Sequence, residues 1–231
     1  MELVRIVVLP GLDGSDLLLD RFVELAPAGY AVTVLPLPDD PAEDYETLTN
    51  GLAARLQEFA PCHLVAESFS GPIGIKLAQR HPELVDQLTL VASFAESPAP
   101  AIVRWLPWSL LFLFPLPLFV ARYFFVGGDR TMSIKVRQAV RGTSRATLTE
   151  RIRSVLSVDV CSELASLRCP VRYLRPSRDR LVSRRAVQRI MAVNDKVVEH
   201  VIAGPHLLLQ TRPMEVWAAI NGANVAREFV G

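Results

Sequence analysis

The sequence is poor in cysteine, with only Cys62, Cys161 and Cys169 among 231 residues. An odd number without a CxxC pair or a Cys/His spacing argues against a disulfide framework and against a structural metal site. The N-terminal segment MELVRIVVLPG also lacks the basic region and the cleavage site of a signal peptide. We therefore expect reduced thiols, no metal and a cytoplasmic protein.

An excess of charge of either sign is also missing, because 25 Lys and Arg face 24 Asp and Glu for a net charge of +1. This balance argues against nucleic acid as a partner. The length suits one domain with room for an insertion. The mean hydropathy of +0.27 is high for a soluble protein and directs attention to the apolar segments.

The stretch Trp105–Ala121 lacks charge altogether over 17 residues. A membrane-spanning helix needs about 20 apolar residues. Three prolines, at positions 107, 115 and 117, interrupt this one, and each disfavours a helix interior. We expect an apolar lid or an interfacial segment rather than a span, which leaves peripheral association with a membrane open.

Apolar runs with strand character alternate with amphipathic helical patterns, which predicts an α/β fold. The expected strands are Val4–Leu9, Tyr30–Leu37, Cys62–Glu67, Gln87–Ala92, Val171–Arg175 and Val197–Ile202. The expected helices are Asp16–Leu25, Pro41–Phe59 with Asp40 as its N-cap, Ser70–His81, Ser183–Ala192 and Pro213–Phe229. The prediction is a doubly wound, mostly parallel sheet of about six strands.

Residues 96–165 interrupt this alternation, because they contain no convincing strand. We interpret them as a helical cap, apolar first and basic afterwards, inserted into a core formed by residues 1–95 and 166–231. The bland alternative is that the apolar part covers the sheet as ordinary core.

The segment HLVAESFSG contains the most informative motif, since an apolar strand ends at Ser68 and a helix follows at once. A nucleophile placed between small residues on such a sharp turn is typical of a nucleophile elbow. Ala66 and Ser70 occupy the small positions. Ser68 is the candidate nucleophile, although a serine there also suits a helix N-cap.

A serine nucleophile needs a base and a group that orients the base. His206 follows the last expected strand in a loop that begins with Gly204-Pro205, whereas the other three histidines lie in strands or at a helix end. Asp179 follows the preceding strand and is the candidate acid. Asp159 is the other acid in reach along the chain, but no strand end presents it.

The oxyanion of an acyl-transfer intermediate needs hydrogen-bond donors. The first strand ends in the glycine-rich loop LPGLDGSD. We expect the backbone N–H groups of Leu12, in that loop, and of Phe69, directly after Ser68, to supply these donors.

The loop VLPGLDGSD, the elbow AESFSG and the segments YLRPSRDRLV and GPHLLLQTRP resemble, in this order, four blocks of the α/β-hydrolase superfamily. The resemblance covers nearly the whole chain and implies hydrolysis of esters or thioesters without a cofactor. Three departures stand out: Pro10-Gly11 replaces the usual His-Gly, the elbow lacks its glycines, and the early antiparallel strands are absent. The loop and elbow are also similar to lipid acyltransferases and esterases of the phytyl ester synthase group.

The cap suggests the substrate class. Its apolar part predicts an acyl pocket lined by Trp105, Trp108, Phe112 and Phe114. Its basic part places Arg137, Arg141 and Arg145 at helical spacing on one expected face. That face suits an anionic partner, such as an acyl carrier protein, a coenzyme A thioester or a membrane surface, or it is simply solvated.

Three functions follow from these residues. The first is a serine hydrolase of lipophilic esters or thioesters with Ser68, Asp179 and His206 as its triad. The second is an acyltransferase that uses the same triad. The third is a lipid-binding or membrane-attached module without catalysis, against which the triad argues.

Overall fold

One parallel sheet of six strands forms the centre of the protein. The computed structural model describes residues 3–99, 106 and 116–228. The strands are β1 (Val4–Leu9), β2 (Tyr30–Val34), β3 (Cys62–Glu67), β4 (Val85–Val91), β5 (Val171–Pro176) and β6 (Val198–Ile202). Their spatial order is β2-β1-β3-β4-β5-β6, and every neighbouring pair is parallel. The predicted α/β fold with six strands is confirmed.

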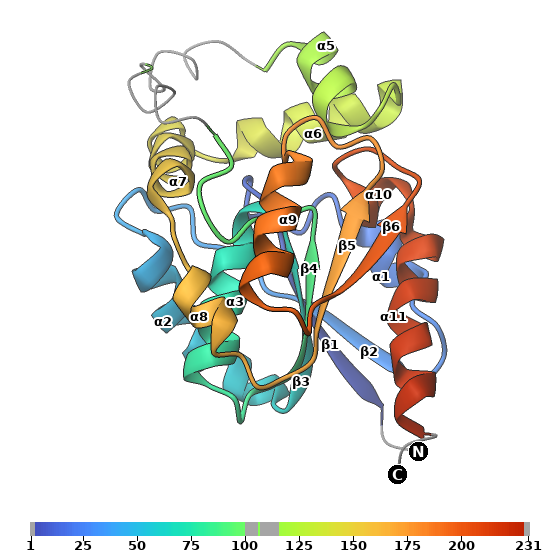
Figure 1. Cartoon of the computed structure of the whole chain (residues 1–231). Helices are drawn as coiled ribbons and strands as arrows, with labels where there is room; N and C mark the ends of the chain where they lie inside the picture. The colour runs from blue at the N-terminus through green and yellow to red at the C-terminus, as the bar shows by residue number, and fades with distance from the viewer. Residues whose placement is uncertain (1–2, 100–105, 107–115, 229–231) are drawn as a thin grey trace.

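Helices cover both faces of this sheet (Figure 1). One face packs against α2 (Tyr45–Leu56), α3 (Gly71–Arg80), α8 (Cys161–Ala165) and α9 (Arg184–Val193), and the other against α1 (Asp20–Glu24) and α11 (Pro213–Glu228). Alternate residues of a strand point to opposite faces. In β1, Val7 and Leu9 therefore join the first core, whereas Ile6 and Val8 join the second.

Strand order reverses between β1 and β3, since the chain moves outward from β1 to β2 and then returns to the other side. Ligands of open α/β sheets bind beyond the carboxyl ends of the strands at such a switch point. The loop after β1 and the turn after β3 meet there, so the topology alone predicts a ligand site near residues 10–14 and Ser68.

The segment between β4 and β5 contains α5 (Leu118–Val120), a π-helical turn (Ala121–Phe125), α6 (Arg130–Gly142), α7 (Arg145–Ser157) and α8. No strand lies between β4 and β5 within the described residues, and an isolated bridge pairs Glu96 with Asp159. Helices α5, α6 and α7 lie over the carboxyl ends of the strands (Figure 1).

In the part of the chain that the structure describes, no helix combines the length and apolarity needed to cross a membrane. Of the uncharged stretch Trp105–Ala121, only Leu106 and the final residues 116–121 are described. These include α5 and the first residue of the π-helical turn.

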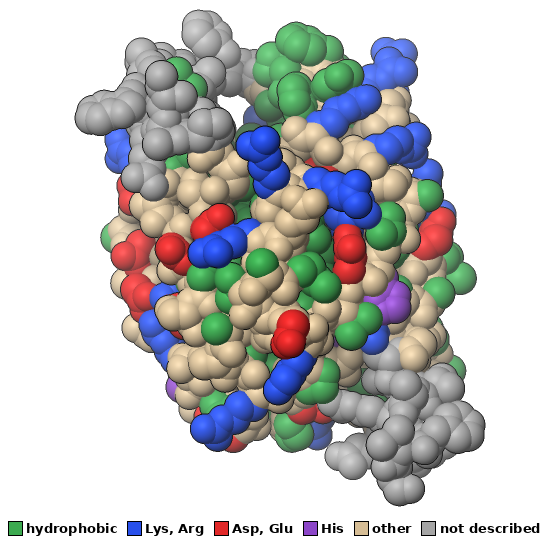
Figure 2. Space-filling view, viewed as in Figure 1, with side chains coloured by type: hydrophobic (Ala, Val, Ile, Leu, Met, Phe, Trp, Pro, Cys, Tyr) green, Lys and Arg blue, Asp and Glu red, His purple; other side chains and the backbone are tan. Residues whose placement is uncertain are grey.

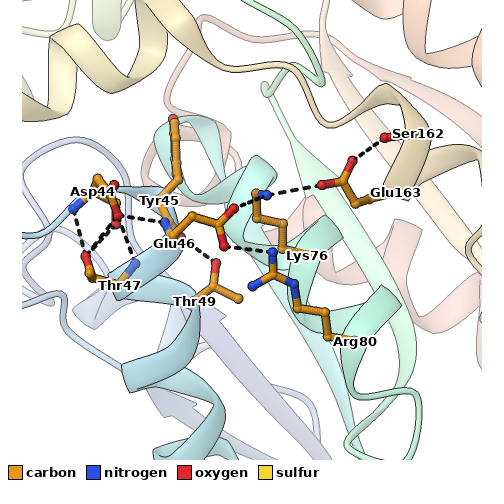
Figure 3. Close-up of polar contacts among 9 residues, drawn as sticks. All are labelled: Asp44, Tyr45, Glu46, Thr47, Thr49, Lys76, Arg80, Ser162 and Glu163. Carbon is orange, nitrogen blue, oxygen red and sulfur yellow. Dashed lines mark hydrogen bonds and ion pairs between the residues drawn. The ribbon is translucent and has the colours of Figure 1, made fainter.

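The helix after β2 begins later than its proline predicted. Asp40 and Pro41 precede α2, and its N-cap is Asp44. The Asp44 carboxylate accepts the backbone N–H groups of Glu46 and Thr47, both at 2.9 Å, while the Asp44 N–H donates to Thr47 Oγ1 at 2.8 Å (Figure 3). This reciprocal capping box satisfies the N–H groups of Asp44, Glu46 and Thr47. Pro41 has no side-chain acceptor that could do the same.

The first expected helix, Asp16–Leu25, and the second expected strand, Tyr30–Leu37, are also shorter in the structure. Residues 16–19 form a turn closed by the Leu19 N–H donating to Asp16 O at 2.8 Å, so α1 begins only at Asp20. The second strand ends at Val34, since Pro36 has no N–H for the ladder. The Leu37 N–H instead donates to Gly14 O at 2.8 Å, which ties this segment to the loop after β1.

Buried charge connects α2, α3 and α8. Lys76 of α3 is only 8% exposed, and its Nζ lies 2.5 Å from Glu46 Oε1 and 3.1 Å from Glu163 Oε1 (Figure 3). Arg80 adds a second contact to Glu46 at 2.7 Å. The hydrogen bond from Lys76 is the main reason that the pKa of Glu46 lies below its usual value.

Gly74 of α3 is required for the close approach of this helix to the sheet. A Cβ atom at this position would lie 2.9 Å from the Cβ of Ala66 and 3.1 Å from Leu88 Cδ1. Gly51 of α2 is a matched control, because a Cβ there would meet no atom of the described residues within 4 Å. Gly74→Ala should lower the free energy of unfolding by about 1–3 kcal/mol through overpacking.

Gly51→Ala should instead raise that free energy by roughly 0.5–1 kcal/mol, because alanine favours a helix interior. Urea denaturation of both variants measures the difference. Equal effects at the two positions would contradict the close-packing interpretation.

Candidate active site

The turn between β3 and α3 has the geometry of a nucleophile elbow. Ser68–Ser70 form a single 3₁₀ turn between Glu67, which ends β3, and Gly71, which begins α3. Ser68 has a φ of 50°, a conformation that costs energy for a residue other than glycine. The sharp turn directs the Ser68 side chain toward the carboxyl end of the sheet.

The small residues of the elbow have two different roles. Ala66 faces Gly74 across the strand–helix contact, which is the steric role that the motif predicts. Ser70 is fully buried, and its hydroxyl donates to Pro10 O at 2.5 Å. The serine in place of glycine therefore ties the elbow to the loop after β1.

The structure brings Ser68, His206 and Asp179 together from three strand ends. His206 Nε2 lies 2.9 Å from Ser68 Oγ, and His206 Nδ1 lies 2.9 and 3.0 Å from the two oxygens of Asp179. A carboxylate only accepts hydrogen bonds, so Nδ1 holds the proton and Nε2 is free to accept the Ser68 hydroxyl. This arrangement can remove the proton from Ser68.

Local contacts hold the side chains of Asp179 and His206. Asp179 Oδ1 accepts the N–H groups of Leu181 at 2.8 Å and Val182 at 3.0 Å. The Phe125 and His206 rings are nearly perpendicular, with their centroids 6.2 Å apart. Asp159, the alternative acid, instead accepts the Cys161 N–H at 3.0 Å.

The predicted oxyanion donors Leu12 and Phe69 both line the same cavity as Ser68 and His206. The loop after β1 is closed by the Gly14 N–H donating to Gly11 O at 3.0 Å. Gly11 lies directly against the elbow, since a Cβ there would be 4.0 Å from Ser68 Cβ.

The cavity beside Ser68 has a volume of about 260 Å³. Its lining is mainly apolar, and no Lys or Arg contributes to it among the described residues. The segment between β4 and β5 supplies Leu116, Phe125, Val136, Val140, Ile152 and Val155. Leu116 and Phe125 belong to the apolar part of the expected cap, residues 101–126, but sequence reasoning missed the residues of α6 and α7 because it treated that part of the cap as basic. Trp105, Trp108, Phe112 and Phe114, which were expected to line the pocket, lie outside the described residues.

The expected basic face of three arginines is wrong. Helix α6 ends at Gly142, and Arg145 is the first residue of α7, so Arg145 does not continue the face of Arg137 and Arg141. Ser144 is the reason, because its side chain caps α7 by accepting the Thr147 N–H at 3.1 Å. Lys and Arg side chains do gather near this end of the molecule (Figure 2).

Sequence reasoning also missed Glu67, whose side chain is buried next to Ser68 in the chain. Gln210 Nε2 donates to Glu67 Oε2 at 2.9 Å, while Glu67 Oε1 finds no hydrogen-bond partner among the residues that the structure describes. Burial raises the pKa of Glu67 to about 7. The only sequence signal was a charged residue at the end of an otherwise apolar strand.

A metal site is not supported at the one cluster of suitable ligands that the described residues contain. Glu96, Asp159 and Cys161 lie close together. Their groups already have protein partners, since Arg189 donates to Glu96 at 3.1 Å and the Cys161 N–H to Asp159. Burial raises the pKa of the Cys161 thiol to about 11, which disfavours the thiolate that binds metal.

Comparison with known proteins identifies the family. A family model described as the alpha/beta hydrolase family matches residues 6–220. This match covers most of the chain, so the protein belongs to the alpha/beta hydrolase family. A curated relative, "Putative carbamate hydrolase RutD" of Caulobacter sp., is 28% identical over 143 residues. That alignment spans 55% of this chain and about half, 53%, of the relative.

Solved structures agree on the fold. An enol-lactonase from Burkholderia xenovorans superposes with a TM-score of 0.82 at 14% identity, covering 96% of this chain and 91% of its own. A structure from a study of Nitrososphaera gargenis carboxylesterases has a TM-score of 0.82 at 16% identity, with coverages of 97% and 92%. A bacterial membrane phospholipase A has a TM-score of 0.79 at 19% identity, with coverages of 95% and 78%.

Glu67 should make stability depend on pH. Its pKa is about 7 in the folded protein and near 4.5 without burial, so between these values the folded state keeps a proton that the unfolded chain releases. Its contribution to stability is present at low pH and is lost as pH rises through this window. Glu67→Gln, which stays neutral, should therefore be more stable than wild type at pH 8, by on the order of 3 kcal/mol.

Urea denaturation at pH 5, 6, 7 and 8 measures this difference, which should shrink toward pH 5. The same substitution at exposed Glu58 is the control and should leave the pH dependence unchanged. A constant offset between Glu67→Gln and wild type at all four pH values would contradict the assignment.

Proposed function

We propose that the protein is a serine hydrolase that cleaves carboxylic esters or thioesters with a lipophilic acyl group through an acyl-enzyme on Ser68. The observation that carries the proposal is the continuous contact from Ser68 Oγ through His206 to Asp179 beside an apolar cavity. A module that only bound lipid would not need a base aligned on a strained serine.

The chemistry follows from these contacts. His206 Nε2 takes the Ser68 proton as Oγ attacks the substrate carbonyl, and Asp179 stabilises the imidazolium. The N–H groups of Leu12 and Phe69 bind the oxyanion of the tetrahedral intermediate. His206 then returns the proton to the leaving alcohol or thiol. A water molecule, deprotonated by His206, releases the carboxylic acid and restores Ser68.

The cavity supports a lipophilic acyl group. Its volume of about 260 Å³ is near the lower limit of small-ligand pockets, about 300 Å³. Because no Lys or Arg is found in its described lining, which does include Asp13 and Glu67, an acyl chain that ends in a carboxylate would be poorly bound. We propose that residues 96–165 act as a cap that closes this cavity over the acyl chain.

The leaving group remains the less constrained half of the substrate. Carbamate, lactone and ester carbonyls, the groups named for the similar proteins, all undergo the same attack by a nucleophile. Docking of an acyl carrier protein, a coenzyme A thioester or a membrane at Arg137, Arg141 and Arg145 stays a prediction. The proposed chemistry does not depend on it, since these side chains lie outside the cavity lining.

Acyl transfer is the second candidate, because an apolar cap that excludes water would let an alcohol intercept the acyl-enzyme. The two reactions are separated by incubating a p-nitrophenyl ester with increasing amounts of a long-chain alcohol. If the alcohol yields a new ester in place of the free acid, while the rate of p-nitrophenol release stays the same, the reaction is acyl transfer. If only the free acid forms, it is hydrolysis.

The triad makes the first functional prediction. Ser68→Ala and His206→Ala should abolish turnover of p-nitrophenyl esters, and Asp179→Asn should lower kcat by about 10⁴-fold through the wrong imidazole tautomer. A fluorophosphonate probe should label wild type at Ser68. Asp159→Asn is the matched control and should keep normal activity. Labelling that persists in Ser68→Ala would rule out this nucleophile.

The second functional prediction concerns the cavity. Val140 of α6 lines the cavity, whereas Ile134 of the same helix is 38% exposed and does not. In wild type each buried methylene should add about 0.8 kcal/mol, roughly a fourfold gain in kcat/KM. Val140→Phe fills part of the cavity, so long esters should lose this gain while acetyl esters keep their rate.

The readout is kcat/KM for a series of p-nitrophenyl esters from two to about ten carbons. Ile134→Phe, which adds the same ring outside the cavity, should leave the chain-length profile unchanged. An equal proportional loss for short and long esters in Val140→Phe would mean that the acyl chain binds elsewhere.

A further inference from the structure

Arg151 of α7 is buried, although it lies in the basic stretch of residues 130–153 that suggests a solvated surface. Its exposure is only 1%. Nη1 donates to Leu12 O at 2.7 Å, and Nη2 donates to Pro38 O at 2.8 Å. A side chain from the segment between β4 and β5 thus binds the loop after β1 directly.

The same guanidinium also contacts Phe69 of the elbow. Arg151 Cζ lies 5.7 Å from the centroid of the Phe69 ring, a cation–π distance. Tyr45 stacks on this ring at 4.9 Å and donates its hydroxyl to Phe69 O at 3.0 Å. Arg151 therefore contacts both residues whose backbone N–H groups are the proposed oxyanion donors, Leu12 and Phe69.

The loop after β1 is shaped to admit this guanidinium. Gly14 has a φ of 74°, and a Cβ atom there would lie 2.6 Å from Arg151 Nη1 and 2.7 Å from Nη2. Neighbouring contacts support the same loop, since Thr143 Oγ1 donates to Asp13 O at 2.7 Å. Arg151 nonetheless donates directly to the Leu12 carbonyl, which belongs to the peptide unit next to that of the Leu12 N–H, the proposed oxyanion donor.

Stability alone is a poor reason for this arrangement. The partners of the guanidinium are two neutral carbonyl groups, while the carboxylates of Asp13 and Asp39 act on it only over longer distances. Desolvation is the main cause that lowers the pKa of Arg151. Taking a cation out of water is costly, and neutral acceptors offset that cost only in part.

We propose that Arg151 is a positioning residue that holds Leu12 and Phe69 in the geometry that binds the oxyanion, so that the segment between β4 and β5 completes the active site. This inference rests on the proposed serine-hydrolase function. It deepens that function by assigning the assembly of the oxyanion hole to a residue of the proposed cap.

The test compares Arg151→Met and Arg151→Lys with the matched control Arg153→Met, whose side chain lies on the exposed side of α7. Misplacing a catalytic group by about 1 Å costs on the order of 10²-fold in rate. Arg151→Met should therefore lower kcat by about 10²-fold with KM little changed. Arg151→Lys, which reaches at most one of the two carbonyls, should lose about tenfold. Arg153→Met should behave as wild type.

A trifluoromethyl ketone separates positioning from mere stability, because its hemiketal with Ser68 places an oxyanion in the hole. Its inhibition constant should rise by the same factor as kcat/KM falls. Titration with a fluorophosphonate should still give one label per chain. Methylguanidinium should partly restore kcat to Arg151→Ala, whereas methylammonium should not.

Two outcomes overturn the proposal. One is a loss of kcat that is fully explained by a smaller fraction of enzyme molecules that react with the fluorophosphonate, with an unchanged inhibition constant for the ketone. The other is full kcat in Arg151→Lys together with no rescue of Arg151→Ala. If Arg151→Met does not fold, the lysine variant and the rescue decide. Wild type that is neither labelled nor active would instead refute the proposed function itself, which keeps the two failures distinct.

Discussion

The strained turn at Ser68 is the constraint on which the rest of the site depends. A serine at a φ of 50° persists only if its surroundings hold it there. Hydrogen bonds fix the turn from three directions: Ser93 Oγ donates to Ser68 O at 2.7 Å, Tyr45 to Phe69 O at 3.0 Å, and Ser70 to Pro10 O at 2.5 Å. These donors come from the segment directly after β4, from α2 and from the elbow itself, so the sheet and its helices jointly determine the position of Ser68.

The parallel sheet explains why distant residues of the chain meet at this turn. Its carboxyl ends point to one edge, where the loops after β1, β3, β5 and β6 supply Leu12, Ser68, Asp179 and His206. The segment between β4 and β5 then contacts these loops separately. Arg151 binds the first, the Phe125 ring lies nearly perpendicular to the His206 ring, and Tyr123 O accepts Arg180 Nη1 at 2.8 Å. A cavity bounded by both parts of the chain is the consequence.

Some expectations from the sequence failed because two local signals competed. Pro41 favours a helix start, but the capping box of Asp44 and Thr47 satisfies more backbone donors and wins. The spacing of Arg137, Arg141 and Arg145 matches one helix, but Ser144 begins a new helix within it. The spacing of residues defines one helix face only if the helix is continuous. The sequence alone does not show which of two possible helix ends the chain will adopt.

The sequence by itself determined the α/β class, five of the six strand starts to within a residue, and the chain order of Ser68, Asp179 and His206, whose side chains are in contact. These features depend on local patterns: apolar runs, turn residues, and polar groups just after strands. Only the tertiary structure decided that Arg151 and Glu67 are buried at the site and that Leu116, Val140 and Ile152 line its cavity. The physical reason is that burial of a charged or apolar side chain depends on which distant segment packs over it, and no local pattern specifies that segment.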